Sequence, residues 1–268
     1  MVGVWAPEQP PIPGYEAIRP LGVNLGVVYL ARHSSSGVLV ALKVWHLKFA
    51  EHARDLLAPL ARLHHPNIIR VVEMGEFEEH FFCALEYVEQ SLADRLAEGP
   101  LADLEVARIA RAVGSALQYA HDHEMVPQSL SRKSIFMTDE NVPKLTGFCA
   151  RETFGKPPVL PPFAEIAPEC VLGDDHVSET GQVYRMGALM YDLLTARPPF
   201  PFTAENAFAT LRRVVDEMPV PPRKVNPKVG RDLDAVCMKC LAKQPKMRYR
   251  SLQDLLDHLE AFERAAGR

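Results

Sequence analysis

The stretch that decides the fold is a run of apolar and β-branched residues around one lysine, Val38-Leu39-Val40-Ala41-Leu42-Lys43-Val44. A similar run, Val27-Val28-Tyr29-Leu30, precedes it, and Ser34-Ser35-Ser36-Gly37 separates the two. Two such runs joined by serine and glycine predict a β-hairpin. Because side chains alternate along a strand, Ala41 and Lys43 share one face, with Val28 of the neighbouring strand beside them.

The next segments of the chain are predicted to extend this sheet, and after them the spacing of the apolar residues changes from that of strands to that of helices. Further strands are predicted at 68–74 and 80–88, with a short helix near 50–63. After residue 91, apolar residues recur at helical spacing in three segments: Val106 to Ala120, Val183 to Leu194, and Leu252 to Phe262. The sequence therefore predicts an α+β chain, in which a mostly antiparallel sheet with one helix is followed by a mainly helical part. A ligand cleft is expected at the junction, near Glu86-Tyr87-Val88-Glu89.

Composition narrows the class of protein. The chain has 268 residues, 47% hydrophobic and 24% charged, with a formal net charge of -4. These values are typical of a globular protein and give no sign of a nucleic-acid partner or a membrane-binding basic run. No apolar stretch approaches the roughly 20 residues of a spanning helix, and the first residues lack the pattern of a signal peptide. A cytoplasmic location is expected.

Cysteine and histidine patterns do not indicate a metal centre. The five cysteines are scattered, and only Cys237 and Cys240 form a C-x-x-C pair. A zinc or redox half-site is one interpretation of this pair. It would need further ligands that the sequence does not offer, so two thiols on a C-terminal helix are the favoured interpretation.

A series of short motifs, weak singly, is specific in its order. It comprises Leu21-Gly22…Gly26-Val27-Val28-Tyr29-Leu30-Ala31, Val40-Ala41-Leu42-Lys43, His65-Pro66-Asn67-Ile68-Ile69, Leu85-Glu86-Tyr87-Val88, Ala167-Pro168-Glu169, Leu194-Thr195-Ala196-Arg197-Pro198-Pro199-Phe200 and Cys240-Leu241-Ala242-Lys243-Gln244-Pro245…Arg248-Tyr249. From about residue 15 to 264 the chain resembles a bacterial serine/threonine protein kinase domain. The resemblance implies a two-lobe kinase fold, with an N-lobe at 15–88 and a C-lobe at 89–264. A proline-rich lead-in at 1–14 and a tail at 265–268 flank it.

The resemblance assigns a set of residues to nucleotide binding. Val28 and Ala41 would cover an adenine ring and Lys43 would reach phosphate. The same set includes Gly22, Gly26, Glu86, Val88 and Phe136. Lys43 could equally persist as a harmless strand-end lysine, since Leu56 stands where relatives carry its glutamate partner and Asp55 is one residue out of register.

Two features weaken nucleotide binding. The segment Gly22-Val23-Asn24-Leu25-Gly26 is one residue shorter than the family's glycine-rich loop. Phe136, where relatives usually carry leucine, could partly fill the adenine pocket.

The family's catalytic loop is altered at every polar position. Ser129 stands for the aspartate that accepts the substrate proton, Ser131 for a lysine, and Ser134 for a metal-holding asparagine. A serine hydroxyl is a poor base unless another group activates it, and the sequence shows no such group. Arg132 and Lys133 are interpreted as part of a solvated loop.

The family's metal and activation-segment positions are altered too. Gly147 stands for the aspartate that binds magnesium, and Gln128 for the arginine that would anchor a phosphorylated segment. Pro157-Pro158 and Pro161-Pro162 stiffen the segment. Glu169 and Arg248 are expected to keep the family's buried ion pair, while Gln182 replaces a structural aspartate.

These losses predict a catalytically inactive pseudokinase, not an enzyme, with no catalytic residue and no metal. Such a module would bind a protein partner, such as an active kinase or its substrate, with ATP bound weakly, without magnesium, or not at all. Two alternatives stay open. One is a serine/threonine kinase with residual or atypical phosphotransfer through Lys43, Arg132 and Lys133. The other is a nucleotide sensor that binds ATP without turnover.

Overall fold

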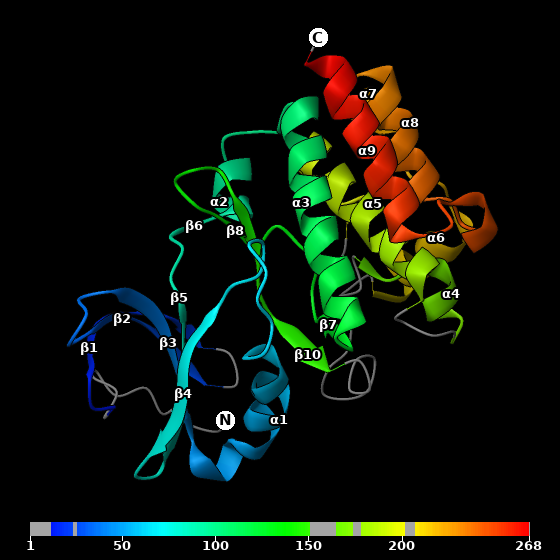
Figure 1. Ribbon diagram of the computed structural model, residues 1–268. Helices are drawn as coiled ribbons and strands as arrows, with labels where there is room; N and C mark the ends of the chain where they lie inside the picture. Colours follow the sequence, from blue (N-terminus) through cyan, green and yellow to red (C-terminus); the bar gives the residue numbers. More distant parts are fainter. Residues whose placement is uncertain (1–11, 24–25, 151–164, 174–177, 202–206, 268) are drawn as a thin grey trace. The chain divides into compact units, whose positions relative to one another are not determined.

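The computed structural model describes residues 12–23, 26–150, 165–173, 178–201 and 207–267 (Figure 1). Within these ranges the chain divides into two compact units, Met1–Val88 and Glu89–Arg268. The first is built on a sheet and the second mainly on helices, so the predicted α+β class is confirmed.

The first unit is an antiparallel five-stranded sheet with one helix. Its strands run in the order β1-β2-β3-β5-β4. Their bounds, with those of the helices, are β1 Tyr15–Val23, β2 Val27–His33, β3 Leu39–His46, η1 Leu47–Phe49, α1 Glu51–Leu60, β4 Val71–Phe77 and β5 His80–Glu86. The hairpin predicted at 34–37 is confirmed, with Gly37 at a positive φ of 70°. The strand expected at 68–74 begins three residues late, at Val71, and the helix expected near 50–63 ends at Leu60.

Strand alternation gives this sheet two buried faces. Val40, Leu42 and Val44 of β3 point to one face, where they join a cluster with Tyr29 and Phe82. On the other face Trp45, Phe81 and Cys83 pack with Ala53 of α1. Ile12, inside the expected lead-in, is also buried against the first face. Lys43 thus lies on a strand whose side chains pack into a buried cluster on each face of the sheet.

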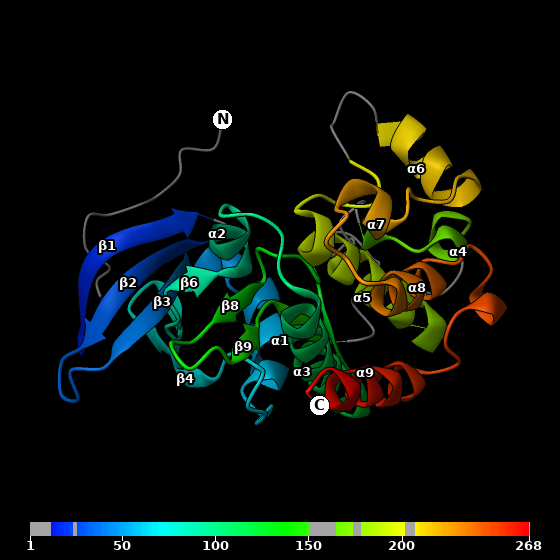
Figure 2. The same ribbon diagram turned by 90° about the horizontal axis from the view of Figure 1, so that it is seen from above.

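The second unit is built around one buried helix. Its elements are β6 Gln90–Ser91, α2 Leu92–Leu96, α3 Asp103–Asp122, β7 Met125–Pro127, β8 Ile135–Met137, β9 Pro143–Leu145, β10 Phe148–Ala150, α4 Pro168–Val171, α5 Glu179–Thr195, α6 Ala207–Asp216, α7 Pro222–Val225, α8 Arg231–Cys240, η5 Pro245–Met247 and α9 Leu252–Ala266. Nearly every residue of α5 is buried, as expected for a helix that other elements surround. The three segments of helical periodicity are confirmed as α3, α5 and α9, and α3 lies beside α9 in both views (Figure 2).

Helices α5 and α8 approach closely at Gly187. A Cβ placed there would lie 2.5 Å from Cys240 Cβ and 3.3 Å from the Cys240 carbonyl carbon. Cys237 Sγ lies 3.5 Å from the Gly187 carbonyl oxygen. The C-x-x-C pair is therefore part of a helix contact. Both thiols are fully buried on α8, and burial raises the pKa of Cys240 to about 12.

We expect Gly187→Ala to destabilise the second unit by about 1–3 kcal/mol, because the added methyl group overpacks a contact that backbone atoms help to form. Denaturant unfolding measures the loss. Gly267→Ala is the matched control, since its Cβ would meet only the Glu263 carbonyl oxygen at 3.5 Å. Equal stability of the two variants would contradict the tight contact.

Candidate functional site

Lys43 lies in the middle of the sheet, paired across the strands with Val28 of β2 and Cys83 of β5. It is half-buried, and its Nζ lies 4.9 Å from the centre of the Trp45 ring. Ala41 precedes it by two residues and faces the same side of the sheet. The predicted grouping of Val28, Ala41 and Lys43 on one face is confirmed by this register.

Burial lowers the pKa of Lys43, and it raises the pKa of the neighbouring Cys83 thiol to about 12. Cys83 is therefore a neutral thiol near pH 7. Within the described residues of this unit, no carboxylate forms an ion pair with Lys43. The side chains of Asp55 and Leu56 lie outside the described residues. Lys43 is thus a half-buried cation, held at a fixed place on the sheet, whose charge no described carboxylate balances.

The two glycines predicted to approach phosphate differ in their surroundings. A Cβ on Gly26 would lie 2.7 Å from Trp45 Nε1 and 2.8 Å from the Val44 carbonyl oxygen, whereas Gly22 faces open space. Packing against Trp45 is by itself a reason for glycine at position 26. Asn24 and Leu25, between them, lie outside the described residues.

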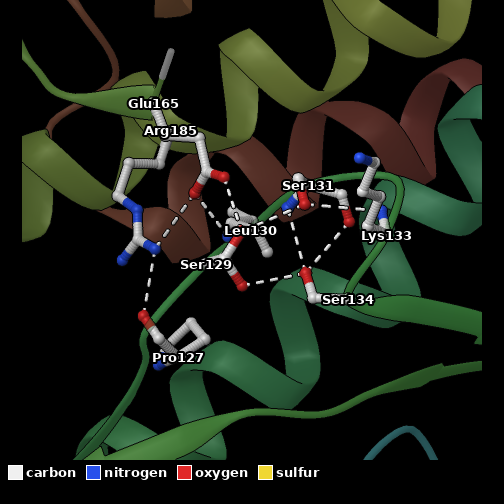
Figure 3. A network of polar contacts seen from close by, with 8 residues as sticks. All are labelled: Pro127, Ser129, Leu130, Ser131, Lys133, Ser134, Glu165 and Arg185. Carbon is white, nitrogen blue, oxygen red and sulfur yellow. Dashed lines mark hydrogen bonds and ion pairs between the residues drawn. The ribbon is translucent and has the colours of Figure 1, made fainter. Parts of the chain in front are cut away.

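A polar network joins the altered catalytic loop to a buried glutamate (Figure 3). Ser129 Oγ donates to Glu165 Oε1 over 2.7 Å, and the backbone amide of Leu130 donates to Glu165 Oε2. Arg185 Nη2 of α5 lies 3.3 Å from the same Oε2 and 3.0 Å from the Pro127 carbonyl oxygen. Glu165 is 5% exposed and Arg185 is 3% exposed.

The sequence showed no group that could activate Ser129, whereas the structure places a carboxylate within hydrogen-bond distance of it. A carboxylate accepts its hydrogen bond, and that carboxylate comes from a residue 36 positions later in the chain. Glu165 precedes the Ala167-Pro168-Glu169 motif by two residues, and nothing in that local pattern marks it as a partner of Ser129. Sequence reasoning missed it for this reason.

The residues at the family's magnesium positions do not fit a magnesium ion. Ser134 Oγ accepts from the Ser131 amide and lies 3.0 Å from the carbonyl oxygens of both Ser129 and Ser131, so the hydroxyl is engaged within the loop. Gly147 has a positive φ of 78° and offers no carboxylate. The described residues hold no group of three or more His, Cys, Asp or Glu side chains that could bind a metal. Magnesium prefers oxygen ligands, and these positions supply none that is uncommitted.

The interpretation of Arg132 as solvated is wrong. Its Nε donates to Asp192 Oδ2 over 2.7 Å, its Nη2 contacts Asp192 Oδ1, and Nη2 also donates to the Ala196 carbonyl oxygen. Asp192 lies on α5, 60 residues away, so local sequence did not indicate the pair. Lys133, in contrast, is exposed as expected.

The ion pair predicted between Glu169 and Arg248 is confirmed. The two guanidinium nitrogens Nη1 and Nη2 donate to the two carboxylate oxygens over 2.6 and 2.7 Å. Gln182, expected to replace a structural aspartate, is buried, and its Oε1 accepts no hydrogen bond from the described residues.

Three further residues of the predicted nucleotide set lie in two different units. Glu86 ends β5, and its carboxylate accepts from the Arg70 amide over 3.2 Å. Val88 is the last residue of the first unit and is half-buried. Phe136 is half-buried on β8 of the second unit, paired with Ser91 and Lys144. Glu86 and Phe136 thus lie on strands, and Val88 lies in the short connection between β5 and β6.

With this sheet, buried helix and catalytic loop described, the comparison with known families is decisive. Residues 15–259 match the protein kinase domain family. The chain belongs to this family.

The kinase domain is similar to several curated bacterial proteins. It is 28% identical over 255 residues to serine/threonine-protein kinase PknB of Mycobacterium leprae, covering 87% of this chain and 40% of that protein. It is 26% identical to serine/threonine-protein kinase PrkC of Bacillus subtilis, covering 90% of this chain and 39% of that protein. A probable serine/threonine-protein kinase of Clostridium perfringens is 24% identical, with 93% and 38% covered. The chain thus spans about two fifths of the length of these relatives.

The prediction that the chain is not an enzyme is contradicted by these comparisons. A protein kinase domain with serine/threonine-kinase relatives points to a kinase. The alternative of a serine/threonine kinase agrees with these relatives better than the pseudokinase interpretation does. As for membranes, none of the helices in the described ranges is long and apolar enough to cross one.

Proposed function

We propose that this kinase domain binds ATP and transfers its γ-phosphoryl group to a serine or threonine hydroxyl of a protein partner, slowly and without a requirement for magnesium. The observation that carries the proposal is Lys43, a half-buried cation whose charge no described carboxylate balances. A cation that is partly removed from water attracts phosphate more strongly than an exposed one, because the surrounding dielectric is lower. The family and the relatives supply the reaction class.

The reaction is expected to be slow because the described residues offer no metal site to neutralise charge on the phosphates. Phosphoryl transfer depends on positioning and on neutralising charge at the transferred group. The positions of Ser134 and Gly147 do not fit a metal ion, so Lys43 must supply more of that charge than in a metal-assisted kinase. Slow phosphoryl transfer that continues without a metal ion is therefore the result expected of this kinase domain.

Two measurements on the purified chain test the proposal. Thermal unfolding with ATP, in magnesium and in EDTA, should show the same stabilisation in both. Incubation with γ-labelled ATP and a serine-containing acceptor protein should give slow label transfer that also persists in EDTA. Label transfer no greater than in the Lys43→Met variant would overturn the catalytic proposal, and no ATP-dependent shift would overturn binding.

Lys43→Met is expected to change two readouts in opposite directions. ATP affinity should fall at least about tenfold, because a charge contact to phosphate is lost. Stability without ATP should rise, because burial penalises the charged form of Lys43. Since its folded pKa lies below the usual 10.5, the wild-type deficit should persist near pH 7 and shrink as pH rises towards 10.5.

Lys48→Met is the matched control for this variant. Lys48 is an exposed lysine of the same unit, on η1. Its replacement should leave ATP affinity within error of the wild type and should change the free energy of unfolding by less than about 1 kcal/mol. If Lys48→Met weakened ATP binding as much as Lys43→Met, the binding would depend on general surface charge and not on the Lys43 site.

A further inference from the structure

The catalytic loop holds a connected chain of hydroxyl groups that ends on a buried carboxylate. Ser129 Oγ lies 2.7 Å from Glu165 Oε1 and 3.0 Å from Ser131 Oγ. A hydroxyl has one proton to donate. The charged carboxylate is the stronger acceptor. We therefore assign the Ser129 proton to the contact with Glu165, and the proton in the 3.0 Å contact between the two hydroxyls (Figure 3) to Ser131.

This arrangement leaves one acceptor position on Ser129. A hydroxyl oxygen has two lone pairs, and Ser131 occupies one of them. Among the described residues no other donor to Ser129 Oγ is found, and the residue is half-buried, so we assign the second lone pair to a donor from outside the loop. A substrate hydroxyl is such a donor.

The carboxylate is held rigidly behind Ser129. The Leu130 amide and Arg185 Nη2 both contact Oε2, which leaves Oε1 directed at the serine. Arg185 also binds the Pro127 carbonyl oxygen and so ties Glu165 to the start of the loop. The Oε2 contacts join Glu165 to the loop backbone and to α5, whereas the Oε1 contact joins it to the Ser129 hydroxyl at the position of the family's catalytic aspartate.

We propose that Ser129 and Glu165 together replace the family's catalytic aspartate, with Ser129 as the catalytic residue and Glu165 acting through it as the final proton acceptor. The inference rests on the proposed function, since it assigns residues to that reaction. The base has moved from the catalytic loop to Glu165, two residues before the Ala167-Pro168-Glu169 motif, and a serine connects it to the substrate.

The substrate oxygen forms a bond to the γ-phosphorus while the bond from that phosphorus to the β–γ bridging oxygen breaks, and ADP leaves with that electron pair. The substrate proton passes to Ser129 Oγ, and the Ser129 proton passes to Glu165 Oε1. After product release, the proton returns from Glu165 through Ser129 to water. No oxidant or metal is required.

The test compares the phosphotransfer rates of variants over a range of ATP concentrations, which gives both kcat and KM for ATP. Glu165→Gln keeps the size of the side chain and an acceptor oxygen for the Leu130 amide but cannot take up a proton. It should lower kcat about 100-fold and leave KM for ATP unchanged, because general-base assistance contributes at least about that factor. Ser129→Ala should lose about as much, whereas Ser129→Thr, which keeps a hydroxyl, should stay within a few-fold of wild type.

Two comparisons and one normalisation make this test decisive. The Ser129→Ala/Glu165→Gln double variant should be no slower than either single variant, because both remove one relay. Glu263→Gln, which breaks the Arg111–Glu263 ion pair on α3 and α9, should leave kcat unchanged. Rates are expressed per folded molecule, with the folded fraction measured by thermal unfolding.

The outcomes separate the two proposals. Wild-type transfer with full kcat in Glu165→Gln would leave the proposed function standing and overturn the relay, making Glu165 a structural brace only. Additive losses in the double variant would also overturn it. No transfer by the wild-type chain would sink the proposed function and the relay together.

Discussion

Arg248→Ala should lower the free energy of unfolding of the Glu89–Arg268 unit by about 3–5 kcal/mol, the usual cost of leaving a buried charge without its partner. The Arg248 side chain is fully buried. Besides its bidentate contact with Glu169, it donates to the carbonyl oxygens of Thr180, Ala242 and Lys243 over 2.7–3.1 Å. Removal of the guanidinium leaves Glu169 and three carbonyl groups without this donor. Denaturant unfolding followed by circular dichroism measures the loss.

A graded series keeps this prediction testable if the alanine variant does not fold. Arg248→Lys keeps the charge but cannot reproduce the bidentate geometry, so an intermediate loss is expected. Arg264→Ala removes an exposed arginine that pairs with Glu260 on α9, and it should cost less than about 1 kcal/mol. An Arg248→Ala protein as stable as Arg264→Ala would show that this ion pair does not brace the unit.

The sequence correctly predicted those helices and strands whose apolar residues recur with a regular spacing along the chain. β2 and β3 follow from alternation around Ser34-Ser35-Ser36-Gly37, and α3, α5 and α9 follow from apolar residues at helical spacing. The boundaries were less accurate. β4 begins only at Val71, and α1 stops at Leu60, although the sequence pattern continued beyond it.

Among the polar pairs described above, only the ion pair whose two residues both match motifs of the family was predicted. Glu169 and Arg248 were expected together because both match the family's motifs. The Ser129–Glu165 and Arg132–Asp192 pairs were not, because their partners lie 36 and 60 residues apart in the chain and no motif in the sequence links them. A local pattern shows that a charge has been lost at position 129. It does not show that a distant carboxylate has come to lie beside it.

This relocation limits how the family's aspartate can be restored. Ser129→Asp should destabilise the chain by about 2–4 kcal/mol near pH 7, because its carboxylate would lie within hydrogen-bond distance of Glu165, whose Oε1 is 2.7 Å from the present hydroxyl. Two carboxylates that share a buried site cannot both be ionised cheaply. The destabilisation should therefore shrink in acid, as one of the two becomes protonated, and thermal unfolding over pH 4–8 measures it.

Glu165→Gln should rescue Ser129→Asp. The amide NH2 group can donate to the new carboxylate, so the double variant should be more stable than Ser129→Asp alone, with a coupling energy of about 2 kcal/mol in the double-mutant cycle. The same double variant should also regain phosphotransfer over Glu165→Gln, since it returns a carboxylate to the catalytic loop. If Glu165→Gln and Ser129→Asp simply added in stability, the two positions would not share one charge site, and the base would not have moved from one to the other.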